Sequence, residues 1–215
     1  MSSSEAKLSA LSEALGLGRD PAPILEALEE LYRATDAELE TSTSSLALPC
    51  REGCDACCHE AVFVSAPEVL FALRELLERD PAHVQRVVAE MIEIAERYSD
   101  ELELLESIEG EERDEVAERV RFRCPLLVGS SCGIYVAREL NARTFGRSVD
   151  ERSGDAFGCG LTREALVQIG VGPLERKRLP GARDARRRLA LAVPKTELVH
   201  VYPWWFRRVA RFIVP

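Results

Sequence analysis

The chain of 215 residues is long enough to bury one hydrophobic core, with or without an appendage. An apolar content of 46% excludes a disordered chain and a membrane bundle, and the sequence has no apolar run of about 18 residues that would predict a transmembrane helix. The net charge of −9 is unevenly spread. Between Leu174 and Pro215, eleven Arg and Lys oppose three Asp and Glu, so a basic tail follows an acidic body.

The basic tail can attract the acidic body of its own chain or an anionic partner. We favour the first interpretation, because mixed-charge helices are common at protein surfaces, and we expect no nucleic-acid partner. The segment Met1–Leu15 has no basic stretch followed by an apolar run, so we expect no signal peptide and a cytoplasmic, reducing location. Disulfides do not persist there, so the seven cysteines indicate metal binding or catalysis.

The first third of the chain is predicted to be helical around one cysteine-rich loop. Residues 1–20 are small and polar, and we expect them to be frayed. A helix is predicted from Asp20–Pro21 to about Glu40 because apolar residues recur at helical spacing. After a polar break, the cysteine-rich loop runs from Cys50 to His59, and the apolar segment 61–64 is either a strand or the lead-in to a helix.

The central part of the sequence predicts long helices. Ser65–Glu68 has the residues of a helix start, and that helix should reach about Arg79. A second helix is predicted from Asp80–Pro81 towards Ile108, stopped or bent by Gly110, and a third covers about 112–120.

The second cysteine region is irregular, and helical patterns return near the C-terminus. Pro125 and the turn at 129–131 interrupt regular structure, and short helices are predicted at 137–145, 162–169 and 182–191. We therefore predict a mainly α fold, a single domain of helices whose irregular cysteine-rich loops form a metal site. Within it we expect an N-terminal helical appendage (1–45), a cysteine-cluster metal-binding domain (46–170) and a basic, aromatic segment packing on that domain (171–215).

The cysteines form two groups. The first reads Cys50-x3-Cys54-x2-Cys57-Cys58 with His59 directly after it, and the second comprises Cys124, Cys132 and Cys159. Thiols at such spacing can converge on zinc or on an iron–sulfur cluster. Because four cysteines within nine residues are hard to explain by core packing alone, we favour metal binding over thiol redox chemistry and inert burial.

The combined pattern resembles the YkgJ-like cysteine-cluster family over about residues 50–160. That family is described as zinc- or iron-chelating domains and includes the flagellin lysine N-methylases. The resemblance rests on the first cysteine group and on three later segments, Cys124-Pro125-Leu126-Leu127, Cys132-Gly133-Ile134-Tyr135-x-x-Arg138 and Arg143-x-Phe145, followed by Cys159. It implies that all seven cysteines are metal ligands and that Arg138 and Arg143 support the site or bind an anionic group of a cofactor.

One segment departs from the family pattern. Where the family reads Arg-Pro-x-x-Cys-Arg, this chain has Glu139 in place of proline and Ala142 in place of cysteine. One ligand implied by the resemblance is therefore missing, and His59, Asp155 or solvent can fill the gap. A missing ligand can also leave an open coordination position of the kind that catalytic metals use.

These observations predict a metal-binding protein that chelates an iron–sulfur cluster or zinc through clustered cysteines. We favour the iron–sulfur cluster because an all-thiolate ligand set is its usual ligation. The alternatives are a cluster-dependent modifying enzyme, methylase-like and using S-adenosylmethionine, and a metal-stabilised module that binds an unidentified protein or small molecule. The first three cysteines also match the radical-SAM spacing, but the alternating strands and helices of those enzymes are not evident downstream. Catalytic residues cannot be assigned from the sequence.

The C-terminal residues 203–215 combine both tryptophans with arginines. Such a segment suits a membrane interface, a nucleic acid or a protein partner. We favour the interpretation that it folds back to close the core, because large aromatic side chains dominate core burial.

Overall fold

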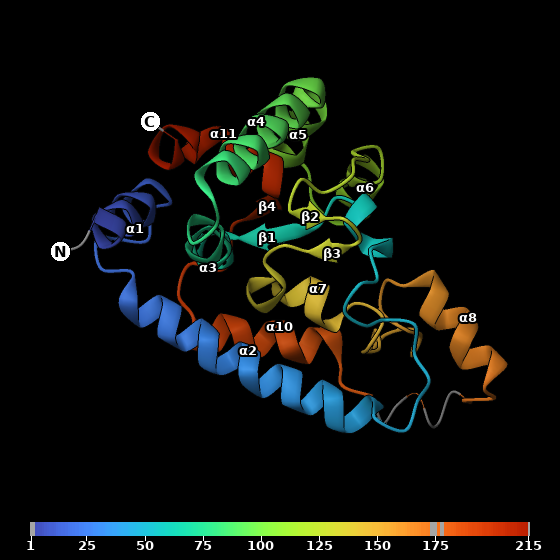
Figure 1. Cartoon of the computed structure of the whole chain (residues 1–215). Helices are drawn as coiled ribbons and strands as arrows, with labels where there is room; N and C mark the ends of the chain where they lie inside the picture. The colour runs from blue at the N-terminus through green and yellow to red at the C-terminus, as the bar shows by residue number, and fades with distance from the viewer. Residues whose placement is uncertain (1–2, 173–175, 177–178, 215) are drawn as a thin grey trace.

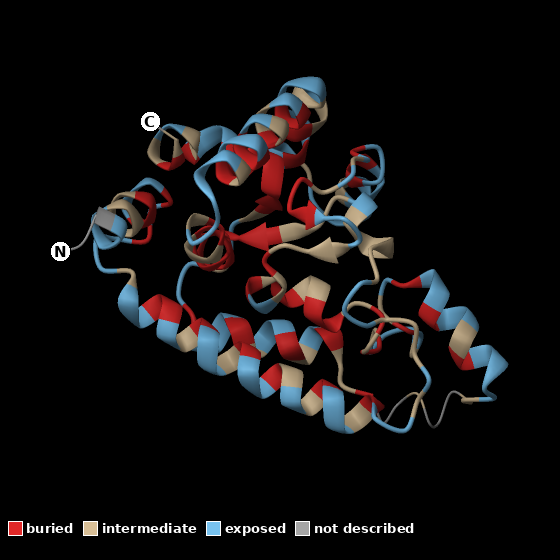
Figure 2. Cartoon of the chain, viewed as in Figure 1, coloured by how far each residue is buried: buried red, intermediate tan, exposed pale blue. Residues whose placement is uncertain are grey.

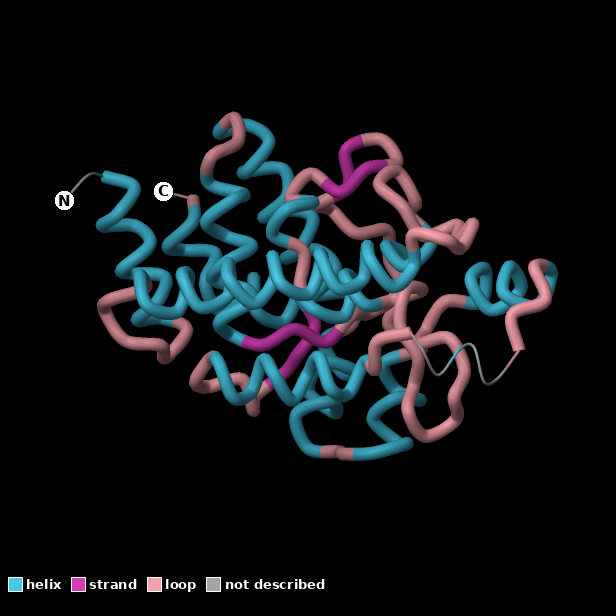
Figure 3. Tube along the Cα trace, turned by 90° about the horizontal axis from the view of Figure 1, so that it is seen from below, coloured by secondary structure: helices cyan, strands magenta, loops and turns pink. Residues whose placement is uncertain are grey.

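The computed structural model describes residues 3–172, 176 and 179–214 (Figure 1). Helices dominate, and the strands form two separate two-stranded antiparallel sheets (Figure 3). The predicted mainly α, single-domain fold is thereby confirmed. Two of the basic residues counted in the tail, Lys177 and Arg178, lie outside the described residues.

The N-terminal segment is more ordered than its composition predicts. Helix α1 covers Ser3–Ala14, where we expected frayed chain. Leu11 is fully buried, and the Nζ of Lys7 donates a 2.8 Å hydrogen bond to the carbonyl of Ile213 in the last helix. The expectation of a frayed end was wrong because α1 is held by long-range packing rather than by its own amphipathic pattern.

Helix α2 (Ala22–Thr43) runs along one side of the molecule beside α10 (Ala182–Ala192), as Figure 1 shows. The polar residues 41–43, predicted as a break, continue the helix. The guanidinium of Arg188 on α10 forms an ion pair of 2.6 Å with the carboxylate of Glu38 on α2. Part of the positive charge of the C-terminal tail is thus paired with the acidic body of the same chain.

Strand β1 (Phe63–Ser65) leads directly into helix α3 (Ala66–Leu77). The helix begins where the sequence predicts, because the carboxylate of Glu68 accepts hydrogen bonds from the Ser65 amide (3.0 Å) and hydroxyl (2.7 Å). A glutamate in the first turn thus satisfies the backbone that enters the helix.

The predicted long helix after Asp80 is divided into α4 (Pro81–Arg97) and α5 (Ser99–Ser107). Asp80 caps α4 by accepting from the Ala82 amide at 2.9 Å. The division falls at Tyr98, whose hydroxyl donates to the Arg121 carbonyl at 2.6 Å, so a single continuous helix was a wrong expectation. Gly110, at a φ of 65°, opens the next helix α6 (Gly110–Ala117) instead of ending one.

The remaining elements are short until the last helix. They are η1 (Ala56–His59), β2 (Leu127–Val128), β3 (Ser131–Cys132), η2 (Tyr135–Ala137), α7 (Leu140–Thr144), α8 (Gly160–Gln168), β4 (Val199–Val201) and α11 (Tyr202–Ile213). Strand β4 pairs antiparallel with β1, so that Phe63 lies opposite Val201.

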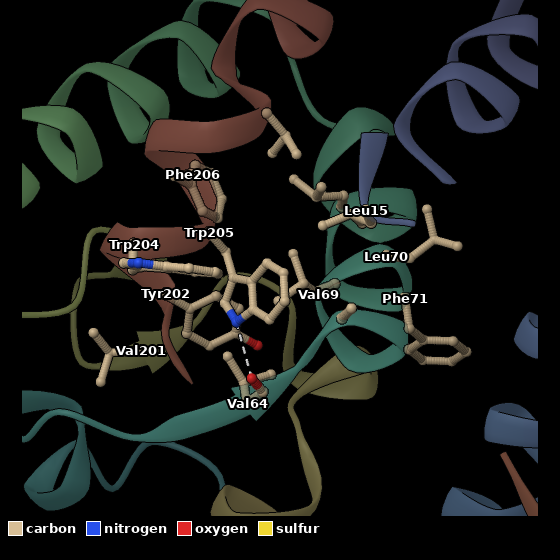
Figure 4. Packing of buried hydrophobic residues seen from close by; sticks show 14 of the residues in the cluster. Leu15, Val64, Val69, Leu70, Phe71, Val201, Tyr202, Trp204, Trp205 and Phe206 are labelled. Carbon is tan, nitrogen blue, oxygen red and sulfur yellow. Dashed lines mark hydrogen bonds between the residues drawn. The ribbon is translucent and has the colours of Figure 1, made fainter. Parts of the chain in front are cut away.

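The aromatic C-terminal segment closes the main core. Trp204 and Trp205 are each 3% exposed, and the Trp205 indole N–H donates to the Val64 carbonyl at 2.9 Å (Figure 4). Helix α11 packs on α4 and α1, while Arg207 and Arg208 are exposed. Figure 2 shows that buried and exposed residues alternate along the helices of the molecule. Among the described residues, none of the helices is both long and apolar enough to cross a membrane.

Helix α8 projects from the main body and has a small core of its own (Figure 1). Leu166 is fully buried there and packs with Val149, Ala156 and Leu179. This smaller cluster supports the loop that carries Cys159.

Candidate metal centre

The first cysteine group lies on a loop and on the short helix η1. Gly53, at a φ of 88°, permits a tight turn in which the Cys54 amide donates to the Arg51 carbonyl at 3.0 Å. Helix η1 then presents Cys57 and Cys58. All four thiols of this group, that of Cys50 included, are partly buried.

Two members of the second group, Cys124 and Cys132, lie at the β2–β3 hairpin. Cys124 precedes β2 and Cys132 lies on β3, opposite Leu127. The amide of Cys124 donates a 2.7 Å hydrogen bond to the carbonyl of Cys58. This backbone contact brings the two cysteine groups together across more than 60 residues of sequence.

Cys159 lies near Cys50 of the first group, and the backbone of Gly146 lies beside both cysteines, where a side chain would not fit. A β-carbon built on Gly146 would lie 3.2 Å from the Cβ of Cys50 and 3.1 Å from that of Cys159. The Cys50 thiol also lies 3.2 Å from the Phe145 carbonyl, which precedes that glycine. A glycine at 146 therefore permits the close approach of two cysteines separated by more than 100 residues.

All seven cysteines line one cavity of about 90 Å³. That volume is several times the ~10–15 Å³ that a single water molecule requires. Each of the seven is a free thiol in this structure. Within the part of the chain that the structure describes, no three His, Cys, Asp or Glu side chains are placed closely enough to hold a metal ion, so the thiols surround the cavity without converging on one point.

Burial favours the protonated form of Cys50 and Cys124. It raises the pKa of Cys50 to about 11 and that of Cys124 to about 12. The pKa of Cys57 is raised first by a hydrogen bond with Cys58 and then by burial. A bound soft metal reverses this preference, because a coordinated thiol loses its proton.

Two amide groups act in the opposite direction, in favour of thiolate. Burial raises the pKa of Cys132, but the N–H of Ile134, two residues later, opposes the rise. The N–H of Leu126 does the same for Cys124. An N–H directed at sulfur stabilises its negative charge, and such bonds are useful to a metal-bound thiolate.

A further part of the cavity wall comes from η2, α7 and α11. Arg138 lies on this wall with its guanidinium 3.9 Å from the ring centre of Tyr135. Glu139, Ala142 and Tyr202 line the same wall. Glu139 is only 5% exposed, and burial raises its pKa.

Two of the predicted site residues lie outside this cavity. Arg143 is 2% exposed, and its guanidinium is held by Asp36, by the Val136 carbonyl and, at 2.9 Å, by the Arg138 carbonyl. The side chain of His59 is half exposed, and its ring lies 3.9 Å from the Asp55 carboxylate. The structure thus brings Arg138 and the seven cysteines to the cavity, but not Arg143 or His59.

Sequence reasoning assigned no site role to Glu139 or Tyr202. Glu139 stands out in the sequence as an acidic residue between Arg138 and Leu140 in a segment close to the second cysteine group. Tyr202 carries no local signal, because it reaches the cavity only through the docking of α11.

The comparisons with known proteins contribute no relative. No protein-family model, curated protein or solved structure matches the chain. The resemblance to the YkgJ-like family therefore stays a prediction, and the argument for function depends on the cavity itself.

Proposed function

We propose that this protein binds a metal centre through thiolates of its clustered cysteines, and that this centre is an iron–sulfur cluster, which takes four of the seven thiols as ligands. The observation that carries the proposal is that residues as distant as Cys50 and Cys159 all border one cavity of about 90 Å³. Chance packing of free thiols would distribute them over several parts of the core.

The chemistry of the donor set favours this function. Thiolates suit soft or borderline metals, and iron–sulfur clusters are usually held by cysteine alone. Zinc bound by three or four thiolates is the alternative metal. In either case the thiols would have to move inward from their positions in this structure to reach a common centre.

The test is the metal and acid-labile sulfide content of the full chain purified without oxygen. We expect iron and sulfide in equal amounts, at about four per chain, with a broad absorption near 400 nm. Colourless protein with one or two zinc ions per chain would support metal binding but identify zinc. Protein that retains no metal and takes up none from iron and sulfide, or from zinc, would overturn the proposal.

A matched pair of variants links the metal to the cavity. Cys132→Ser should reduce the bound metal by at least half, because it removes a ligand on β3. Ser130→Ala, on the turn of the same hairpin, should retain the wild-type content. Equal metal content in the two variants would place the centre elsewhere.

A further inference from the structure

Arg138 is a mostly buried arginine whose charge is not matched by hydrogen bonds. Its side chain is 12% exposed, and the residue lines the cysteine cavity. Within the described residues the guanidinium forms no hydrogen bond, and its Nε atom is buried without a partner. The carboxylate of Asp36 lies 3.9 Å away, which is beyond hydrogen-bond distance. A guanidinium in this state has lost hydration without replacing it.

Three other arginines show how the chain supports a buried guanidinium elsewhere. Arg143, Arg147 and Arg176 also form ion pairs, and their side chains are at most 15% exposed. Each of the three donates at least two hydrogen bonds of 3.2 Å or less, to carboxylates, to a hydroxyl or to backbone carbonyls. Arg138 is the exception among these four described arginines, although it is as buried as the others.

The neighbours of Arg138 leave the edge of its guanidinium open. One oxygen of Asp36 accepts from Arg143, and the other is the atom 3.9 Å from Arg138. The ring centre of Tyr135 lies 3.9 Å from the Arg138 guanidinium, so the aromatic ring covers one of its faces. The N–H groups of a guanidinium point outward in its plane, so the place for a missing partner is at that edge.

The charges around the cavity favour an anion as this partner. Burial raises the pKa of Glu139 and that of Cys50, so these two neighbours favour their neutral forms. The positive charge of Arg138 opposes the rise at Cys50. The other acidic residue that lines the cavity, Glu60, is exposed. Arg138 is therefore a buried cation in a wall whose buried acidic groups favour the uncharged state.

The shape and the lining of the cavity narrow the class of anion. Apolar side chains such as Leu126, Ile134 and Phe145 line much of it beside the thiols. Its volume of about 90 Å³ suits a small organic group rather than a large hydrated ion. A planar carboxylate matches a guanidinium with two parallel hydrogen bonds.

We propose that the cysteine cavity is also a binding site for the carboxylate of a small organic acid, and that the guanidinium of Arg138 holds this carboxylate. The inference goes beyond the proposed function and does not rest on it, because the metal centre uses the thiols and the carboxylate site uses Arg138.

The experiment titrates the full chain, purified without oxygen, with potassium acetate and with potassium propionate. Potassium chloride at the same ionic strength is the control. Protein NMR follows the backbone amides and the arginine side-chain N–H groups. We expect saturable shifts at the Arg138 Nε–H and at amides of the cavity wall with both carboxylates, and none that saturate with chloride. The metal content of the same sample is measured in parallel.

Three variants assign the binding to one side chain. Arg138→Lys keeps the charge but loses the planar fork, and it should bind acetate about fivefold more weakly or worse. Arg138→Met should show no saturable binding. Arg51→Met removes the exposed arginine that also lines the cavity, and it should keep the wild-type dissociation constant. The amide spectrum reports whether each variant is folded, and Arg138→Lys decides the question if Arg138→Met does not fold.

The outcomes separate this inference from the proposed function. The inference is overturned if the wild type shows no saturable shift up to roughly 50 mM carboxylate, well above a millimolar dissociation constant. Shifts that chloride reproduces, or an unchanged dissociation constant in Arg138→Lys, overturn it as well. A chain that holds no metal but binds acetate through Arg138 supports this site while contradicting the proposed metal centre. A chain that holds metal but binds neither carboxylate does the reverse.

Discussion

At the scale of single residues, Arg143 shows how a buried cation can serve the site without touching it. Its guanidinium lies 4.1 Å from the ring centre of Tyr32 and bonds two carbonyls in the segment that carries Arg138. Those carbonyls would otherwise be buried without donors, which is costly. Arg143 thereby fixes the position of the cavity wall formed by η2 and α7.

Replacement of Arg143 by Met should lower the free energy of unfolding by about 2–4 kcal/mol, because two carbonyls lose their donors and Asp36 loses the nearer of its two cations, the other being Arg138 at 3.9 Å. Urea unfolding measures the change. Arg74→Met is the matched control, since Arg74 also lies over an aromatic ring, that of Phe71, but forms only a long 3.4 Å ion pair with Glu29 at the surface. A loss of similar size in both variants would contradict this account.

Gly146 allows a second prediction at this scale. Alanine there would have to adopt a φ of 73° and would place its Cβ 2.8 Å from the Thr162 hydroxyl, beside two cysteines. We expect Gly146→Ala to cost about 2–4 kcal/mol of unfolding free energy and to lower metal retention. Gly154→Ala has a similar φ of 70° but meets nothing within 4 Å, so it isolates the backbone cost of about 1 kcal/mol. Equal losses at the two glycines would refute the crowding at 146.

At the scale of elements, the pairing of β4 with β1 depends on the neutral form of His200. The Nδ1 atom of its ring accepts a 2.9 Å hydrogen bond from the Val201 amide, so the proton resides on Nε2, 3.2 Å from the Leu102 carbonyl. The ring also stacks on Trp204 with centroids 4.4 Å apart. A proton on Nδ1 would remove the acceptor for the Val201 amide and so break this hydrogen bond at the entry to α11.

Burial lowers the pKa of His200 from 6.5 to about 4, so the unfolded chain binds the proton more readily than the folded one between these values. The stabilisation is complete above about pH 6.5 and is lost as the pH falls towards 4, at up to about 1.4 kcal/mol per pH unit. Urea unfolding between pH 7.5 and 4.5 should show a shallower dependence for His200→Gln than for wild type in the same metal state. His83→Gln should retain the wild-type slope, and parallel curves for all three proteins would disprove the assignment.

Elements that depend on local sequence were predictable, and those that depend on distant contacts were not. The starts of α3 and α4 carry their own capping residues, Glu68 and Asp80, and both begin where expected. Helix α1 and strand β4 have weak local patterns and form against α11 and β1, far away in the sequence.

The same division holds for the candidate site. The cysteine spacing indicated the site, whereas Glu139 and Tyr202 belong to it only because α7 and α11 meet there.

At the scale of the whole molecule, a metal centre at this cavity would stabilise the fold by joining loops from three parts of the chain. A ligand that binds only the folded state at about 1,000 times its dissociation constant adds roughly 4 kcal/mol. For a chain of this length we therefore expect removal of the metal to lower the melting temperature by roughly 10 °C. Calorimetry before and after chelation measures this, with Cys132→Ser as a control that should respond less. Identical melting with and without the metal would show that the centre has no structural role.

The presence of Tyr202 in the cavity wall has a consequence for biosynthesis. The first cysteine group leaves the ribosome about 150 residues before this tyrosine, and the hairpin and Cys159 follow in between. The cavity is complete only when α11 has been synthesised and has docked on α4. If the chain binds a metal as proposed, delivery to the finished site would be a late event in the maturation of the protein, because a nascent chain that met metal earlier would offer it thiols without the part of the wall that contains Tyr202.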